Sequence, residues 1–222
     1  MASALDSYSV QLRSSLPDLD HAEQRFKRAG GLVKIQAALA EVAKQHPSSD
    51  RFGLHLLHRH SDLEDDEIMV ESGPATQPYH LADLSSAAIS GLRASVWGLS
   101  QDIKKFTPLQ FAFGEEDSGK GMDDLDAALA EAVAEVLVQH GLEHVFGLAA
   151  TEPGQEMMME TTHGRAEILI PARQLAEELA ATDVLWPLSG LGPGPARPTA
   201  QCAQRCIKDR DGRHHHYHFK LK

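Results

Sequence analysis

The sequence predicts an α+β fold, in which a mainly antiparallel sheet carries helices on one face. Three observations point to this class. Apolar residues recur at helical spacing in residues 32–46 and 122–140, and shorter alternating stretches between turns are typical of strands. Between residues 144 and 170 three such stretches are joined by turns too short for crossover helices, which favours antiparallel neighbours.

Capping residues and apolar stripes place the expected helices at 18–27, 32–46, 84–92, 122–140 and 172–182. The helix over 122–140 has the strongest pattern, because Leu125, Leu129 and Val133 lie on one apolar stripe. Gly141 supplies a C-terminal stop for this helix. An acidic N-cap at Asp18 or Asp20 starts the first helix.

The expected strands cover 52–60, 67–71, 108–113, 144–150, 156–162 and 165–170. Residues 108–113 alternate between larger apolar and other side chains, and the turn at His163-Gly164 is short enough for a tight hairpin. Two prolines close together in residues 73–81 predict a loop there rather than a strand.

Glycine and proline also suggest how the chain is divided. Residues 189–198 contain three glycines and three prolines, so they are expected to form a linker or a long loop. The predicted organisation is an α+β domain over 1–188, this linker, and a Cys/His-rich terminal arm over 199–222.

The composition is acidic, with 21 Lys and Arg against 32 Asp and Glu and a formal net charge of −11. This balance argues against nucleic acid or an anionic membrane as the partner. No apolar run approaches the roughly 20 residues that a membrane-spanning helix needs, and the N-terminus lacks a secretory signal pattern. We therefore expect a cytoplasmic protein with a small-molecule substrate, and the oligomeric state is left open.

Histidines are the main excess in this composition, with 13 in the chain and clusters at 55–60 and 214–218. Because side chains alternate along a strand, His58 and His60 would point to the same face. Glu67 on the expected return strand would lie opposite them, and two imidazoles with a carboxylate form three legs of a divalent-metal site. The alternative is that both imidazoles form hydrogen bonds with the acidic turn at 62–66.

Gly53, His58, His60, Glu67 and Gly73 resemble the first conserved motif of the cupin superfamily, which consists of a glycine, a histidine pair spaced by one residue, a glutamate and a closing glycine. The resemblance covers only residues 53–73, and no second cupin motif follows. It implies a metal ion held by the histidine pair and the glutamate. Glu64 is the alternative carboxylate for this pattern.

The terminal arm offers a second candidate site. Cys202 and Cys206 are four positions apart and could face one zinc ion, completed by two of the histidines in 214–218. Alternatively, the terminal segment pairs beside residues 52–60, so that His214, His216 and His218 share a face and one of them becomes a third imidazole for the histidine pair.

These patterns predict a metal-dependent enzyme that uses zinc or iron at a histidine-rich centre. Glu67, or else Glu64 or Glu71, would act as a ligand or general base, and Arg59 would contact an anionic group of the substrate. The alternative function is a non-catalytic interaction protein, with structural zinc bound by Cys202, Cys206 and the terminal histidines.

Overall fold

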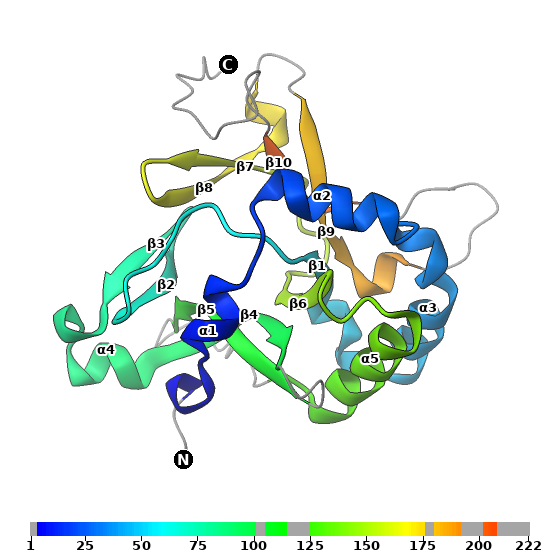
Figure 1. The fold of residues 1–222 in the computed structure, drawn as a ribbon, viewed down its shortest axis with the longest axis horizontal. Coiled ribbons are helices and arrows are strands. Elements are labelled where there is room, and N and C mark those ends of the chain that lie inside the picture. Colours follow the sequence, from blue (N-terminus) through cyan, green and yellow to red (C-terminus); the bar gives the residue numbers. More distant parts are fainter. Residues whose placement is uncertain (1–3, 101–104, 115–124, 176–179, 192–201, 208–222) are drawn as a thin grey trace.

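The computed structural model describes residues 4–100, 105–114, 125–175, 180–191 and 202–207. Ten strands close into a barrel in the order β1-β6-β4-β5-β2-β3-β8-β7-β10-β9, and β9 pairs with β1 to complete it (Figure 1). The strands are β1 Phe52–Leu56, β2 Glu67–Ser72, β3 Ala75–His80, β4 Leu92–Leu99, β5 Phe106–Phe113, β6 Phe146–Ala150, β7 Met158–His163, β8 Ala166–Pro171, β9 Ala181–Pro187 and β10 Gln204–Ile207. The α-helices are α1 Val10–Ser14, α2 Leu19–Arg28, α3 Gln36–Gln45, α4 Ser86–Gly91 and α5 Ala127–His140.

The predicted α+β fold, an antiparallel sheet with helices on one face, is wrong. The sheet closes on itself, and it is mixed, because β2 pairs with β5 and β7 pairs with β10 in parallel. Alternation within a strand indicates which side chains share a face, but it carries no information on which strand becomes the neighbour. Barrel closure depends on those non-local pairings.

The local signals for helices were more reliable. Helix α2 begins after Asp18, whose side chain accepts a hydrogen bond from the His21 N–H. Helix α5 begins after the N-cap Asp126 and ends at Gly141, which adopts a left-handed conformation with φ of 66°. Helices α2, α3 and α5 lie along one side of the barrel (Figure 1).

Several strand predictions need correction. The expected strand over 52–60 ends at Leu56, and residues 73–81, expected as a loop, contain β3. Pro78 is tolerated in β3 because β8 pairs with that strand only at Ala75 and Thr76, so Pro78 need not donate a hydrogen bond to β8. The expected helix over 172–182 is also wrong at its end, where β9 begins at Ala181.

The expected antiparallel meander is correct only in its second half. Strands β7 and β8 form a hairpin in which His163 pairs with Ala166, and Gly164 takes a positive φ of 64° in the turn. Strand β6 pairs with β1 and β4 instead of β7. The hairpin was predictable because its turn is local.

The two faces of β1 have different surroundings. Leu54 and Leu56 belong to the large apolar cluster that includes side chains of α2, α3 and α5. His55 lies between them in sequence and therefore points to the opposite face, into the barrel. The apolar part of that interior includes Leu12 at α1 and Leu185 of β9, which pairs with His55.

Strand β10 lies between β7 and β9. It comes from the segment expected to start a separate terminal arm, so this part of the chain belongs to the barrel. The remainder of the expected linker and arm, 192–201 and 208–222, lies outside the described residues.

No helix in the described part of the chain is both long enough and apolar enough to span a bilayer.

Candidate metal centre

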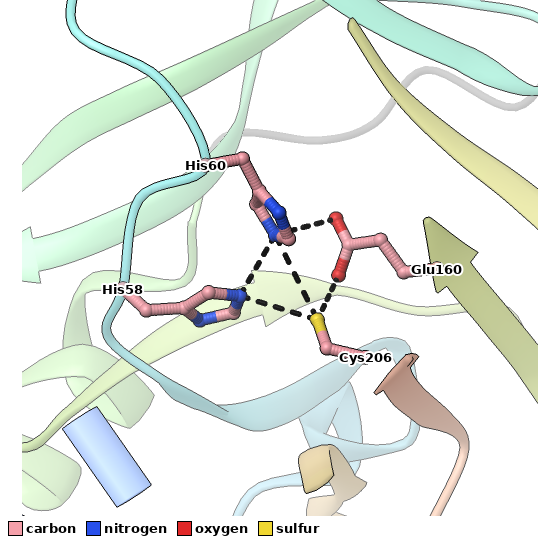
Figure 2. A group of neighbouring side chains, drawn as sticks. All are labelled: His58, His60, Glu160 and Cys206. Carbon is pink, nitrogen blue, oxygen red and sulfur yellow. Dashed lines mark hydrogen bonds and ion pairs between the residues drawn. The ribbon is translucent and has the colours of Figure 1, made fainter. Parts of the chain in front are cut away.

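Four side chains bring their donor atoms together inside the barrel: His58, His60, Glu160 and Cys206 (Figure 2). One donor atom from each residue lies within 4.8 Å of the donors of the other three. Cys206 is fully buried, His58 and Glu160 are each 5% exposed, and the His60 side chain is 3% exposed. The described structure therefore contains a buried His/Glu/Cys cluster that could hold a metal ion.

Three distant parts of the chain build this cluster. Glu160 on β7 and Cys206 on β10 are register partners in the parallel pairing, so their side chains share a face. His58 and His60 follow β1, in a segment anchored by the Leu57 N–H, which donates to the Val145 carbonyl. Both imidazoles point toward Glu160 and Cys206 (Figure 2).

The distances between these donors resemble the edges of a coordination tetrahedron. His58 Nε2 lies 2.9 Å from His60 Nε2 and 3.2 Å from Cys206 Sγ. His60 Nε2 lies 3.4 Å from Glu160 Oε1 and 3.7 Å from Cys206 Sγ, while Cys206 Sγ donates to Glu160 Oε2 at 2.6 Å. Ligand bonds to zinc of about 2.0–2.3 Å imply edges of roughly 3.3–3.7 Å. A bound ion would require the shortest contacts, His58 to His60 and Cys206 to Glu160, to lengthen, and the two Glu160 distances end on different oxygens of its carboxylate.

Outer contacts orient the donors. The backbone carbonyl of Leu56 accepts a 2.7 Å hydrogen bond from His58 Nδ1, so this nitrogen carries the proton of the neutral ring and Nε2 keeps a lone pair. His60 Nδ1 lies 2.9 Å from Thr162 Oγ1, and Gln204 Nε2 donates to Glu160 Oε2 at 2.9 Å. Contacts of this kind fix the ring orientation of metal-binding histidines.

Burial and mutual charge set the ionisation of the cluster. Burial lowers the pKa of His58 to about 3, which keeps this imidazole neutral. Burial tends to raise the pKa of Glu160, but the neighbouring His60 outweighs this effect and the pKa is lowered. Burial and then Glu160 raise the pKa of the Cys206 thiol well above its usual value. A divalent ion would offset this last effect, because coordination deprotonates a thiol.

The structure separates Glu67 from the histidine pair. Strand β2 pairs with β3 and β5, so Glu67 is not on a strand beside β1. Its carboxylate pairs with Arg165 through both terminal guanidinium nitrogens and lies 3.6 Å from His80 Nε2. Among the residues that resemble the cupin motif, only the two histidines belong to the cluster.

The other predicted site residues fall in different places. Arg59 forms an ion pair with the exposed Asp62. Cys202 Sγ donates to the Gln204 carbonyl at 2.8 Å and is not a member of the cluster, whereas Cys206 is. His216 and His218 lie outside the described residues.

Glu160 is the ligand candidate that sequence reasoning missed. It lies within the expected strand over 156–162, on the same face as Thr162. The only sequence feature that could have pointed to it is a carboxylate in a strand that also has apolar residues. That signal does not identify a partner, because Glu160 meets Cys206 only through the parallel pairing of β7 with β10.

A second group of potential donors consists of Glu64, Asp66 and His80. Both carboxylates are exposed, and His80 Nδ1 lies 3.1 Å from Asp66 Oδ1. An ion pair at the surface accounts for this group without an ion.

Further buried polar side chains accompany the cluster. Glu167 on β8 pairs in register with Thr162, and its Oε2 accepts a 3.2 Å hydrogen bond from Gln110. Arg13 from α1 is 2% exposed, and its Nη2 lies 3.9 Å from Glu167 Oε1. The ring of His55 stacks on His58 at a centroid distance of 5.5 Å.

Several polar atoms in this group have no hydrogen-bond partner among the described residues. They are Arg13 Nε and Nη2, Glu167 Oε1, His55 Nδ1 and Tyr8 Oη. Burying a polar atom without a partner costs free energy, so such atoms usually meet water or a ligand. The interior therefore has more hydrogen-bonding capacity than the fold itself uses.

Compared with protein-family models, curated proteins and solved structures, the chain shows no significant match.

Proposed function

We propose that this protein is a metal-dependent enzyme, acting on a small molecule at an ion bound by His58, His60, Glu160 and Cys206. The observation that carries the proposal is the meeting of four donor atoms within 4.8 Å of one another, from three separate parts of the chain. Imidazole, carboxylate and thiol groups brought together in a buried site suit a transition metal.

Zinc suits this donor set best. Two nitrogens, one oxygen and one thiolate sulfur are all zinc ligands, and a tetrahedral arrangement is its usual geometry. The sulfur disfavours magnesium and calcium, which prefer oxygen. Iron(II) is the second choice, because His58, His60 and Glu160 also supply the pair of histidines and one carboxylate that non-haem iron uses.

The surroundings of the four donors favour catalysis. A zinc ion held by these four residues would supply Lewis-acid chemistry to a substrate oxygen. Burial raises the pKa of Glu167, so this carboxyl group holds its proton at a higher pH than an exposed one. Glu167 is therefore the group that we propose for proton transfer, in place of Glu67.

A structural zinc site is the second candidate function. All four donor side chains are buried, and closed sites with four protein ligands are typical of structural zinc. The ion would then fasten β7 and β10 to the segment after β1. Of the zinc ligands expected in the terminal arm, only Cys206 is kept in this site. His58, His60 and Glu160 take the places expected for Cys202 and the terminal histidines.

Elemental analysis of untagged protein tests whether the centre binds metal. We expect one zinc per chain, and Cys206→Ser should weaken zinc binding by at least about tenfold, since losing a ligand costs no less than losing an outer contact. Cys202→Ser is the matched control, because this thiol is outside the cluster and should leave zinc content unchanged. Protein without metal, or equal zinc in both variants, would end the proposal.

Cobalt-substituted protein separates the enzyme from the structural site. Azide, a small ligand for open coordination positions, should change the visible spectrum if the ion can accept a further ligand, as an enzyme requires. An unchanged spectrum at saturating azide would favour the structural role.

A further inference from the structure

Arg13 presents an unusual arrangement for a buried arginine. Its side chain is 2% exposed, yet Nε and Nη2 have no hydrogen-bond partner among the described residues. These two nitrogens form one edge of the planar guanidinium group, and their N–H bonds point in nearly the same direction. Such an edge matches the two oxygens of a carboxylate.

The same chain shows how this edge is used elsewhere. Arg173, at the surface, binds Glu156 with Nε at 2.7 Å and Nη2 at 3.3 Å. Arg165 binds Glu67 with its two terminal nitrogens. Both arginines therefore hold a carboxylate in bidentate fashion, whereas Arg13 makes no such pair although it is the most deeply buried of the three.

Glu167 does not fulfil this role for Arg13. Its Oε1 is 3.9 Å from Arg13 Nη2, which is beyond hydrogen-bond distance, and its other oxygen accepts a hydrogen bond from Gln110. The two groups attract each other, but the donors on the Arg13 edge and the Glu167 Oε1 acceptor all remain without hydrogen bonds. A molecule with an acceptor for Arg13 and a group that can donate to Glu167 would satisfy both.

We infer that Arg13 binds the carboxylate group of a small monocarboxylate substrate through Nε and Nη2, beside the proposed metal centre. This inference rests on the proposed function, since it names the class of molecule that the centre acts on. Arg59, the anion contact expected from sequence, already pairs with Asp62 at the surface. Arg13 takes over that role from within the barrel.

Arg13 lies within electrostatic reach of the centre. Burial is the largest influence on the lowered pKa of His55, and the positive charge of Arg13 lowers that pKa further. The geometry also places Arg13 near the centre, because its Nη2 lies 3.9 Å from Glu167 Oε1 and Glu167 pairs in register with Thr162. Thr162 Oγ1 in turn lies 2.9 Å from His60 Nδ1. A substrate held by Arg13 would therefore lie in the same interior as the four donor residues.

The charges of this interior favour a monoanion over a dianion. With Glu167 holding its proton, Glu160 and a metal-bound Cys206 thiolate supply two negative charges. Arg13 and a divalent ion supply three positive charges. A carboxylate would neutralise the remaining positive charge, whereas a phosphate dianion would leave one buried negative charge in excess.

Calorimetric titration of the zinc-loaded full-length chain with acetate and with inorganic phosphate tests the inference. Acetate should bind at least about tenfold more tightly than phosphate, because a second buried negative charge costs more than 1.4 kcal/mol in this setting. Arg13→Met should weaken acetate binding by about tenfold or more, and Arg13→Lys should do so as well, because lysine keeps the charge but lacks the two-nitrogen edge. Arg173→Met is the matched control and should bind acetate like the unaltered chain.

The outcomes distinguish this inference from the proposed function. Zinc content is measured on the unaltered chain and on every variant. Absence of zinc from the unaltered chain counts against the metal centre itself. Three results obtained at full zinc content would overturn the monocarboxylate site alone. They are no acetate binding, equal acetate affinity in Arg13→Lys and the unaltered chain, and tighter binding of phosphate than of acetate. If Arg13→Met does not fold, the comparison of Arg13→Lys with the unaltered chain decides the question.

Discussion

The helix-covered side of the barrel and its interior beside β7 and β10 contain very different side chains, although one strand can contribute to both. On β1, Leu54 and Leu56 are fully buried in the apolar cluster with the helices, while His55 between them faces the interior. The covered side consists of close apolar packing. The interior gathers histidines, carboxylates, a thiol and an arginine, several with unused hydrogen-bonding atoms. The comparison suggests that stability comes mainly from the covered side, whereas the interior is adapted to bind something.

The largest expected effect concerns the covered side. Phe146 is fully buried and packs against Phe26 and Trp186. Phe146→Ala should lower the free energy of unfolding by about 3–5 kcal/mol, because it removes apolar contacts and leaves a cavity. Chemical denaturation measures this loss, and Val33→Ala, at a side chain that is 82% exposed, is the control and should change little. Equal losses in both variants would contradict the assigned packing.

A smaller effect should come from the interior. At a free zinc concentration of one hundred times Kd, the unaltered chain should gain about 2.7 kcal/mol of stability over the metal-free chain. Cys206→Ser should lose about half of this gain or more, because tenfold weaker binding leaves about 1.4 kcal/mol. Phe146→Ala, provided that it folds, should retain the gain, since Phe146 is not part of the donor cluster. Thermal unfolding with and without a chelator measures the gain. A zinc effect of undiminished size in Cys206→Ser would show that the ion binds elsewhere.

The smallest effect concerns Glu67, which lies outside the donor cluster. The hydrogen bonds from Arg165 hold the pKa of Glu67 below its ordinary value. The pair therefore contributes stability above the ordinary carboxyl pKa of about 4.3, and this contribution is lost as the pH falls through the lower pKa of the folded state. Glu67→Gln should be less stable than the unaltered chain at neutral pH, and the difference should shrink in acid.

Denaturation curves at several pH values test this prediction, with zinc content as the second measurement. Glu67→Gln should bind zinc like the unaltered chain, because Glu67 pairs with Arg165 rather than with the histidines. A fall in zinc content would restore Glu67 as a ligand. A stability difference that does not depend on pH would argue against the ion pair.

The sequence determined the features that depend on neighbours along the chain. Asp18, Asp126 and Gly141 mark helix ends through contacts within a few residues, and the hairpin at His163 and Gly164 needs only a short turn. The closeness of His58 and His60 in sequence also identified the pair, although β1 ends at Leu56 and strand alternation is not what brings their rings together. These signals were readable because their physical causes are local.

Only the tertiary structure decided which strands became neighbours. It closed the sheet into a barrel, directed Glu67 toward Arg165, and brought Glu160 and Cys206 beside the histidine pair through the parallel pairing of β7 with β10. Strand alternation fixes the face on which a side chain lies, but the partner across that face depends on the free energy of packing the whole chain. The histidines could therefore be recognised from sequence, whereas the remaining donors could be assigned only from the fold.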